Sequence, residues 1–196
     1  MERRLDESWI VAGLTKRKAN YSPVLCFETV DPKRIYQLKS FVLSSPEFAQ
    51  AEHVFLYDPW DGLGILRKGA DGPVFEPYRK RPVSQTPVGA RVRGTDGGVE
   101  LQVLKGILKE VDLYLKAVPT VFILQNLSEV READTGFQAA IRAWALDPQV
   151  VARGSTVIVL TSDASRIMDE FTREFVVIIQ VDPSSAEERM SLIQSI

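Results

Sequence analysis

The sequence predicts a three-layer α/β domain in which helices cover both faces of a mainly parallel, five-stranded sheet. Five short apolar runs lack strict polar alternation, and each is followed by a segment with apolar residues at helical spacing. Strands of this kind are buried on both faces, as in doubly wound α/β folds. Hydrophobic residues make up 45% of the 196 residues, so the chain has enough apolar material for a large core.

The first part of the chain supplies two of the predicted strands and two helices. Leu5 to Lys18 carries apolar residues at helical spacing, and the apolar run from Pro23 to Phe27 predicts a buried strand. Asp31 and Pro32 predict the start of the next helix, with Asp31 as its N-cap and Pro32 in its first turn. The second strand is expected from His53 to Tyr57.

A segment rich in glycine, proline and basic residues interrupts this alternation at about residues 58–98. We interpret it as a loop-rich basic excursion, with room for a hairpin, at the carboxyl edge of a single domain spanning residues 1–196. Its basic side chains are candidate contacts for nucleic acid or an acidic partner, although the net charge of -2 does not favour a dedicated nucleic-acid binder. These candidates are Arg79, Lys80, Arg81, Arg91 and Arg93.

Regular alternation returns after residue 98 and continues to the end of the chain. The three remaining strands are expected at Thr120 to Leu124, Ser155 to Leu160 and Phe175 to Val181. The helices between and after them are expected at Val99 to Val118, Glu132 to Leu146, Ala164 to Phe171 and Ser184 to Ile196. The apolar pattern of the last helix is still running at Ile196, so we expect the chain to be a fragment of a longer one.

The single cysteine and single histidine argue against several chemistries. Cys26 has no partner for an intramolecular disulfide, and a lone thiol inside an apolar run fits a reducing cytosol. His53 begins one strand and Cys26 lies inside another, so neither a Cys–His catalytic pair nor a four-ligand zinc site is expected. No signal peptide or membrane-length apolar stretch is present, so the sequence predicts a cytoplasmic protein without a membrane partner.

The carboxyl ends of the strands are where ligands bind in such a sheet, and no phosphate-binding loop follows the first strand. Residues 28–32 read Glu-Thr-Val-Asp-Pro, without glycine and with two carboxylates that would repel phosphate. The third strand ends in Gln125 and Asn126, where an ATPase would carry two acids. These amides can form hydrogen bonds but cannot act as a base or hold magnesium strongly, and they could simply close the strand.

The fourth strand ends in Thr161, and two interpretations are open there. Its hydroxyl could face a bound phosphate, but Thr161, Ser162 and Asp163 also form an ordinary helix cap, which we favour. A small-molecule enzyme that uses Glu28, Asp31 and Asp163 as acid and base is a further alternative. It has the least support, because nothing in the sequence brings these carboxylates together.

Several segments of the chain share features with one family. Residues 21–27 follow a long helix and lead from an apolar strand into an acid-rich turn, and residues 57–63 end a strand with Trp and then Gly-Leu. Residues 120–124 and 155–162 lie where a Walker B strand and a first sensor strand belong. Residues 175–189 lead from a strand through a proline into a helix that bears an arginine. This order resembles the N-terminal half of AAA-type ATPases related to the chloroplast and cyanobacterial family, whose first module is degenerate.

The resemblance implies a degenerate P-loop NTPase-like fold and a non-catalytic N-terminal module for regulation, assembly or substrate recognition. The catalytic ATPase module would follow Ile196 in the same chain and would hold ATP and Mg²⁺, whereas this segment would hold no cofactor. The whole protein would assemble as a homo-oligomeric ring. Arg173 or Arg189 would then present its charge to a neighbouring nucleotide as an arginine finger does, although a surface ion pair is the plainer interpretation. The alternative is a nucleic-acid- or partner-binding module that uses the basic residues 67–93.

Overall fold

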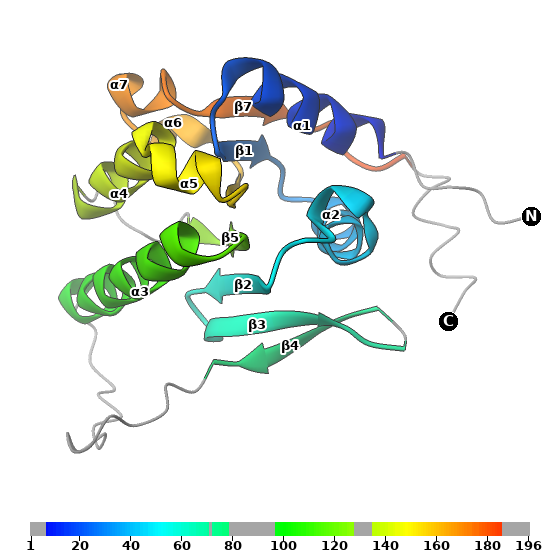
Figure 1. Cartoon of the computed structure of the whole chain (residues 1–196), viewed down its shortest axis with the longest axis horizontal. Helices are drawn as coiled ribbons and strands as arrows, with labels where there is room; N and C mark the ends of the chain where they lie inside the picture. Colours follow the sequence, from blue (N-terminus) through cyan, green and yellow to red (C-terminus); the bar gives the residue numbers. More distant parts are fainter. Residues whose placement is uncertain (1–6, 71, 79–96, 128–134, 186–196) are drawn as a thin grey trace, which may run out of the picture.

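Seven strands form one mixed sheet in the order β4-β3-β2-β5-β6-β1-β7 in the computed structural model, which describes residues 7–70, 72–78, 97–127 and 135–185 (Figure 1). The five strands from β2 to β7 in this order run parallel, whereas β3 and β4 pair antiparallel. The strands are β1 (Val24–Glu28), β2 (His53–Asp58), β3 (Gly62–Lys68), β4 (Pro73–Pro77), β5 (Thr120–Leu124), β6 (Thr156–Thr161) and β7 (Val177–Gln180).

The prediction of a mainly parallel α/β sheet is confirmed, but the predicted number of five strands is wrong. The segment interpreted as a loop-rich excursion at the carboxyl edge begins with a β-hairpin beside β2, and β3 and β4 are its two strands. Without the hairpin, β2 would expose a row of unpaired backbone groups to solvent. Pro73 and Pro77 lie in the new edge strand, where their missing N–H groups discourage further pairing.

Helices cover both faces of the sheet and complete three layers (Figure 1). One face carries α1 (Ser8–Asn20), α2 (Pro32–Ser44) and the short 3-10 helix η1 (Pro46–Phe48). The opposite side carries α3 (Gly97–Ala117), α4 (Thr135–Leu146), α5 (Pro148–Ala152), α6 (Ala164–Ile167) and α7 (Glu170–Arg173). In these described ranges, no helix combines the length and apolar character needed to cross a bilayer.

One predicted helix differs from the structure, and another lies mostly outside the described residues. The helix expected from Ala164 to Phe171 is two short helices, because the Asp169 side chain accepts a hydrogen bond from the Thr172 N–H and starts α7 as a separate helix. The helix expected from Ser184 lies outside the described residues beyond Ser185.

The core consists of two apolar clusters, one on each face of the sheet. Successive residues of a strand point to opposite faces. In β1, Val24 and Cys26 therefore pack with α3 and α4, whereas Leu25 and Phe27 pack with α1 and α2. Both sets are fully buried, which explains why the strand sequences show no polar alternation.

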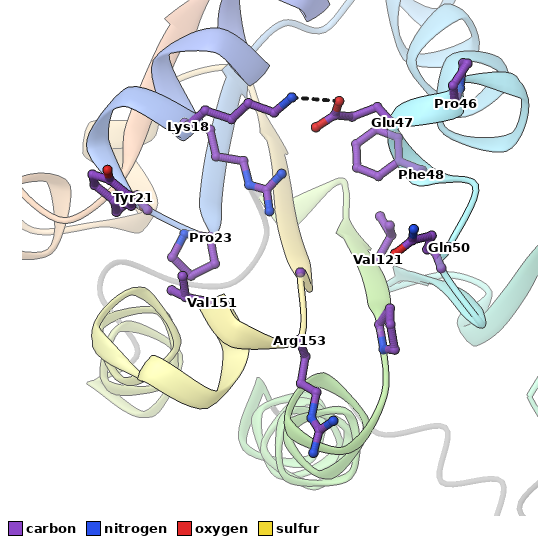
Figure 2. Close-up of a pocket in the computed structure, with 15 residues that line it drawn as sticks. Lys18, Tyr21, Pro23, Pro46, Glu47, Phe48, Gln50, Val121, Val151 and Arg153 are labelled. Atoms are coloured by element: carbon purple, nitrogen blue, oxygen red, sulfur yellow. Dashed lines mark hydrogen bonds and ion pairs between the residues drawn. The ribbon is translucent and has the colours of Figure 1, made fainter.

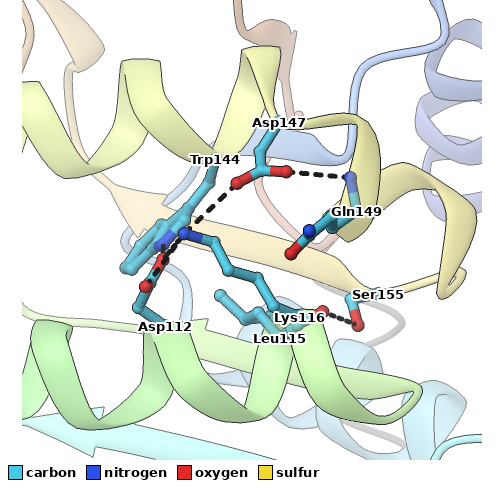
Figure 3. A network of polar contacts seen from close by, with 7 residues as sticks. All are labelled: Asp112, Leu115, Lys116, Trp144, Asp147, Gln149 and Ser155. Carbon is cyan, nitrogen blue, oxygen red and sulfur yellow. Dashed lines mark hydrogen bonds and ion pairs between the residues drawn. The ribbon is translucent and has the colours of Figure 1, made fainter.

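A polar network joins α3 to α4, α5 and β6 (Figure 3). Asp112 accepts a hydrogen bond from Trp144 Nε1 at 2.8 Å, and Lys116 Nζ lies 2.9 Å from an Asp112 oxygen and 3.2 Å from an Asp147 oxygen. The hydrogen bond to Asp112 is the main cause of the raised pKa of Lys116. Ser155 Oγ donates to the Leu115 carbonyl at 2.8 Å, so the start of β6 is tied to the same helix.

Candidate functional site

The carboxyl ends of β1, β5 and β6 surround a small cavity of about 80 Å³. The parallel register brings Glu28 of β1 beside Thr161 of β6, and Thr29, Asn126 and Thr161 all line the cavity. Ligands of open α/β sheets bind at this edge, so it is the candidate site. The structure therefore brings together two of the predicted residues, Asn126 and Thr161.

The turn between β1 and α2 is held by bonds within the chain. The Thr29 N–H donates to the Thr161 carbonyl at 2.7 Å, and the Asp31 N–H donates to Thr29 Oγ1 at 3.1 Å. The Asp31 carboxylate accepts from the Lys33 N–H at 2.9 Å, which confirms the predicted N-cap. The same carboxylate accepts from the Ser184 N–H at 2.6 Å. The first turn of α2, where a phosphate would sit in a phosphate-binding loop, thus holds the chain's own carboxylate.

Hydrogen bonding also sets the charge state of Asp31. Partial burial alone would raise the pKa of Asp31, but hydrogen bonds from Ser184 and from the Lys33 and Arg34 backbone outweigh it and lower the pKa to about 2. The group is therefore ionised near neutral pH, and its negative charge faces the edge at which an anionic nucleotide would bind.

A second carboxylate occupies the start of α6 in the same way. Glu28 Oε1 accepts from the Ala164 N–H at 2.8 Å, and Asp163 Oδ1 accepts from the Ser165 N–H at 2.8 Å. This geometry confirms the helix cap predicted after Thr161. Hydrogen bonds from Ser165 are the main cause of the lowered pKa of Asp163. Glu28 and Asp163 thus both accept hydrogen bonds from backbone N–H groups at the start of α6, whereas Asp31 caps α2.

Gln125 and Asn126 both bind Asp58, a residue that the sequence interpretation did not select. Gln125 Nε2 and Asn126 Nδ2 donate to Asp58 Oδ2 at 2.5 and 2.6 Å, and the Trp60 N–H donates to Asp58 Oδ1 at 2.8 Å. Asp58 is only 3% exposed. It directly follows the apolar run of residues 53–57, so the rule that selected Gln125 and Asn126 at a strand end could have selected Asp58 as well.

Among the basic candidates, Arg173 lies in the described part of the chain, and it does not line this cavity. Arg173 is partly buried in α7, and its Nε has no hydrogen-bond partner in the described part of the chain. After the Ser165 hydrogen bonds, the charge of Arg173 also contributes to the lowered pKa of Asp163, so an acidic group lies near this side chain. Arg189 and the basic candidates Arg79, Lys80, Arg81, Arg91 and Arg93 lie outside the described residues.

Metal and thiol chemistry find little support in the residues that the structure covers. No group of three or more His, Cys, Asp or Glu side chains in that part gathers to hold a metal ion. Cys26 is fully buried in β1, and burial raises the pKa of its thiol, which keeps it protonated and poorly nucleophilic.

No family model, curated protein or solved structure matches the chain.

Proposed function

We propose that this chain is a non-catalytic α/β module that serves regulation, assembly or substrate recognition for an AAA-type ATPase. The occupied carboxyl edge of the sheet carries this proposal. Two helices, α2 and α6, begin at this edge, and N–H groups of a first helical turn are the donors that hold phosphate in a phosphate-binding loop. Asp31 caps α2 and Glu28 binds the first N–H of α6, so both ends already hold an anion.

The remaining cavity supports the same conclusion. Its volume of about 80 Å³ is well below the roughly 300–1,000 Å³ of typical small-molecule pockets. The described residues that line it offer hydroxyl groups, an amide and apolar side chains, with no lysine to bind phosphate and no carboxylate to hold magnesium. The Asn126 amide is engaged by Asp58.

The AAA-type part of the proposal depends on the sequence resemblance. The apolar strand after a long helix, and Trp60 followed by Gly62 and Leu63 after β2, support it. Gln125 and Asn126 depart from the paired acids of the family, so the resemblance is to a degenerate module. ATP and Mg²⁺ would then belong to a catalytic module in the same longer chain. The present module would dock on that neighbour, and the protein would assemble as a ring.

Calorimetric titration of Mg²⁺–ATP and of ADP into the purified chain tests the non-catalytic part. We expect no binding up to about 1 mM nucleotide, because a phosphate at this edge would meet two carboxylates, and no lysine is among the described residues that line the cavity. Micromolar binding or ATP turnover would overturn this part.

The coding sequence downstream of residue 196 tests the AAA-type part separately. A Walker A motif followed by two acids at the end of a later apolar strand is the expected finding. A stop codon, or a downstream domain without these motifs, would remove the catalytic partner that the proposal needs.

A further inference from the structure

A larger cavity lies at the opposite edge of the sheet, where β1, β5 and β6 begin (Figure 2). It encloses about 560 Å³, a volume within the range of small-molecule pockets. Its walls come from the end of α1, from η1 and from the segments that enter β5 and β6. The cavity is separate from the carboxyl edge, so a ligand could bind here whether or not the proposed function holds.

Arg17 places a partly buried positive charge at this cavity. Its Nη2 donates to the Ser155 carbonyl at 3.3 Å, and no carboxylate of the described residues lies within ion-pair distance of the guanidinium. Burial lowers the pKa of Arg17, and the charge of Glu47 opposes this shift. A guanidinium that has lost water without gaining an acidic partner is a strong donor for an incoming anion.

The other charged groups leave the cavity positive. Three basic residues and one acidic residue line it. Lys18 of α1 reaches Glu47 of η1, and their ion pair of 2.9 Å neutralises that carboxylate (Figure 2). Arg153 donates through Nε to the Lys116 carbonyl at 3.2 Å and adds a second unneutralised charge at the rim.

Two carbonyl groups at the end of α1 are already hydrogen-bonded. Helix C-termini normally expose carbonyl groups that repel anions. Here the Arg17 and Lys18 carbonyls accept from the Ser22 and Tyr21 N–H groups, each at 3.3 Å, so they are already capped.

Apolar side chains line much of the cavity, beside the polar residues Tyr21, Ser22 and Gln50. Phe48 and Val121 are buried at the cavity, and Pro23 and Val151 face them from the other side (Figure 2). The apolar lining that reaches solvent comes mainly from Pro46, Pro119 and Val151. An inorganic ion would leave these three side chains in contact with water, whereas an organic ligand would cover them.

We propose that this cavity binds a small organic anion. Its carboxylate or phosphate group binds Arg17, and its apolar or aromatic body packs against Pro46, Pro119 and Val151. Glu47 is the one acid among the described residues that line the cavity, and it competes with the bound anion for positive charge. Removing the Glu47 charge therefore strengthens binding, whereas removing the Arg17 charge weakens it.

Calorimetry on the whole chain with three probes tests this proposal. Phenyl phosphate combines an anion with a ring, inorganic phosphate lacks the ring, and benzyl alcohol lacks the charge. We expect phenyl phosphate to bind with a dissociation constant of about 1 mM or tighter, and inorganic phosphate and benzyl alcohol to bind at least about tenfold more weakly. Binding of inorganic phosphate as tight as that of phenyl phosphate would contradict the role of the apolar walls.

Two charge variants with opposite expected effects make the test specific. Arg17→Gln should weaken phenyl phosphate binding about tenfold or more, and Glu47→Gln should strengthen it several-fold at low salt. The control Arg67→Gln, on the hairpin, should change nothing. If Arg17→Gln does not fold, Glu47→Gln still decides, because it removes only an exposed ion pair. No binding of phenyl phosphate at about 10 mM, or binding unchanged in Glu47→Gln, would overturn the proposal.

Discussion

Asp31 links two segments that are far apart in the sequence. Its carboxylate accepts from the Lys33 N–H in the first turn of α2 and from the Ser184 N–H after β7. One side chain therefore caps a helix and fixes the exit of the last strand beside it. Because these bonds favour the charged form, folding depends on the ionisation of Asp31.

Replacing Asp31 should reveal how the stability of the fold depends on the charge of this side chain. Asp31→Ala should lower the free energy of unfolding by about 1–2 kcal/mol near neutral pH, because the cap is lost. The pKa of Asp31 is lowered to about 2 in the folded chain, below its value of about 3.9 in the unfolded chain, so its charge stabilises the fold above about pH 4. That stabilisation disappears as the pH falls from about 4 to about 2.

Urea unfolding across this pH range measures the effect. Asp31→Asn is the matched control, since it keeps an oxygen acceptor for the cap but cannot titrate. The gap in unfolding free energy between the native chain and Asp31→Asn should narrow as the pH falls toward about 2. A gap that stays constant would mean that the Asp31 charge contributes nothing to stability.

Local signals account for which site residues the sequence could predict. Asp31 and Asp163 cap helices that begin within two residues of them, so a short window of sequence is enough. The contact of Asp58 with Gln125 joins residues 67 positions apart and depends on β2 lying beside β5. The position of Arg17 beside Ser155 likewise follows from the packing of α1 against the sheet, which no spacing reveals.

Among the secondary-structure elements, the strands of the hairpin, β3 and β4, were also harder to predict from the sequence than the parallel strands. The five parallel strands were predicted because both of their faces are buried, which produces continuous apolar runs. The hairpin strands mix glycine, proline and charged residues, because an edge strand buries less of its surface. Within the hairpin, the Phe75 ring lies over Gly64, where a larger residue would collide with it.

A pair of glycine substitutions with opposite expected signs tests this element. A Cβ at Gly64 would collide with the Phe75 ring and lie 2.8 Å from the Glu76 carbonyl oxygen, so Gly64→Ala should cost about 1–3 kcal/mol of stability. Gly106 lies in α3 with open space around its Cα, so Gly106→Ala should add about 0.5–1 kcal/mol through better helix propensity. Thermal and urea unfolding measure both. Equal effects of the two substitutions would show that Phe75 moves aside freely.

At the scale of the whole molecule, the two edges of the sheet differ in how they are filled. Side chains and backbone N–H groups close the carboxyl edge and leave about 80 Å³, whereas the amino edge keeps about 560 Å³ beside Arg17. The usual ligand position of an α/β sheet is therefore the more occupied of the two. The sequence predicted the absence of a phosphate-binding loop, because that requires only residues 28–32. It did not predict the second cavity, whose walls come from distant segments.

The polar network around Asp112 joins α3 to α4 and to the start of α5 (Figure 3). Trp144 is 1% exposed, and its indole N–H donates to Asp112. Asp112→Ala leaves this buried donor unpaired and should cost about 1–3 kcal/mol. Lys116→Met removes only ion pairs between partly exposed groups and should cost less than about 1 kcal/mol.

Urea unfolding at low and high salt separates the contribution of the Asp112–Trp144 hydrogen bond from that of the Lys116 ion pairs. The loss in Asp112→Ala should persist at high salt, because it comes from a buried hydrogen bond, whereas the smaller loss in Lys116→Met should shrink as the ion pairs are screened. Asp112→Asn, which keeps an oxygen acceptor for Trp144, should fall between the other two variants. If Lys116→Met is as damaging as Asp112→Ala, the ion pairs and not the indole hydrogen bond hold these helices together.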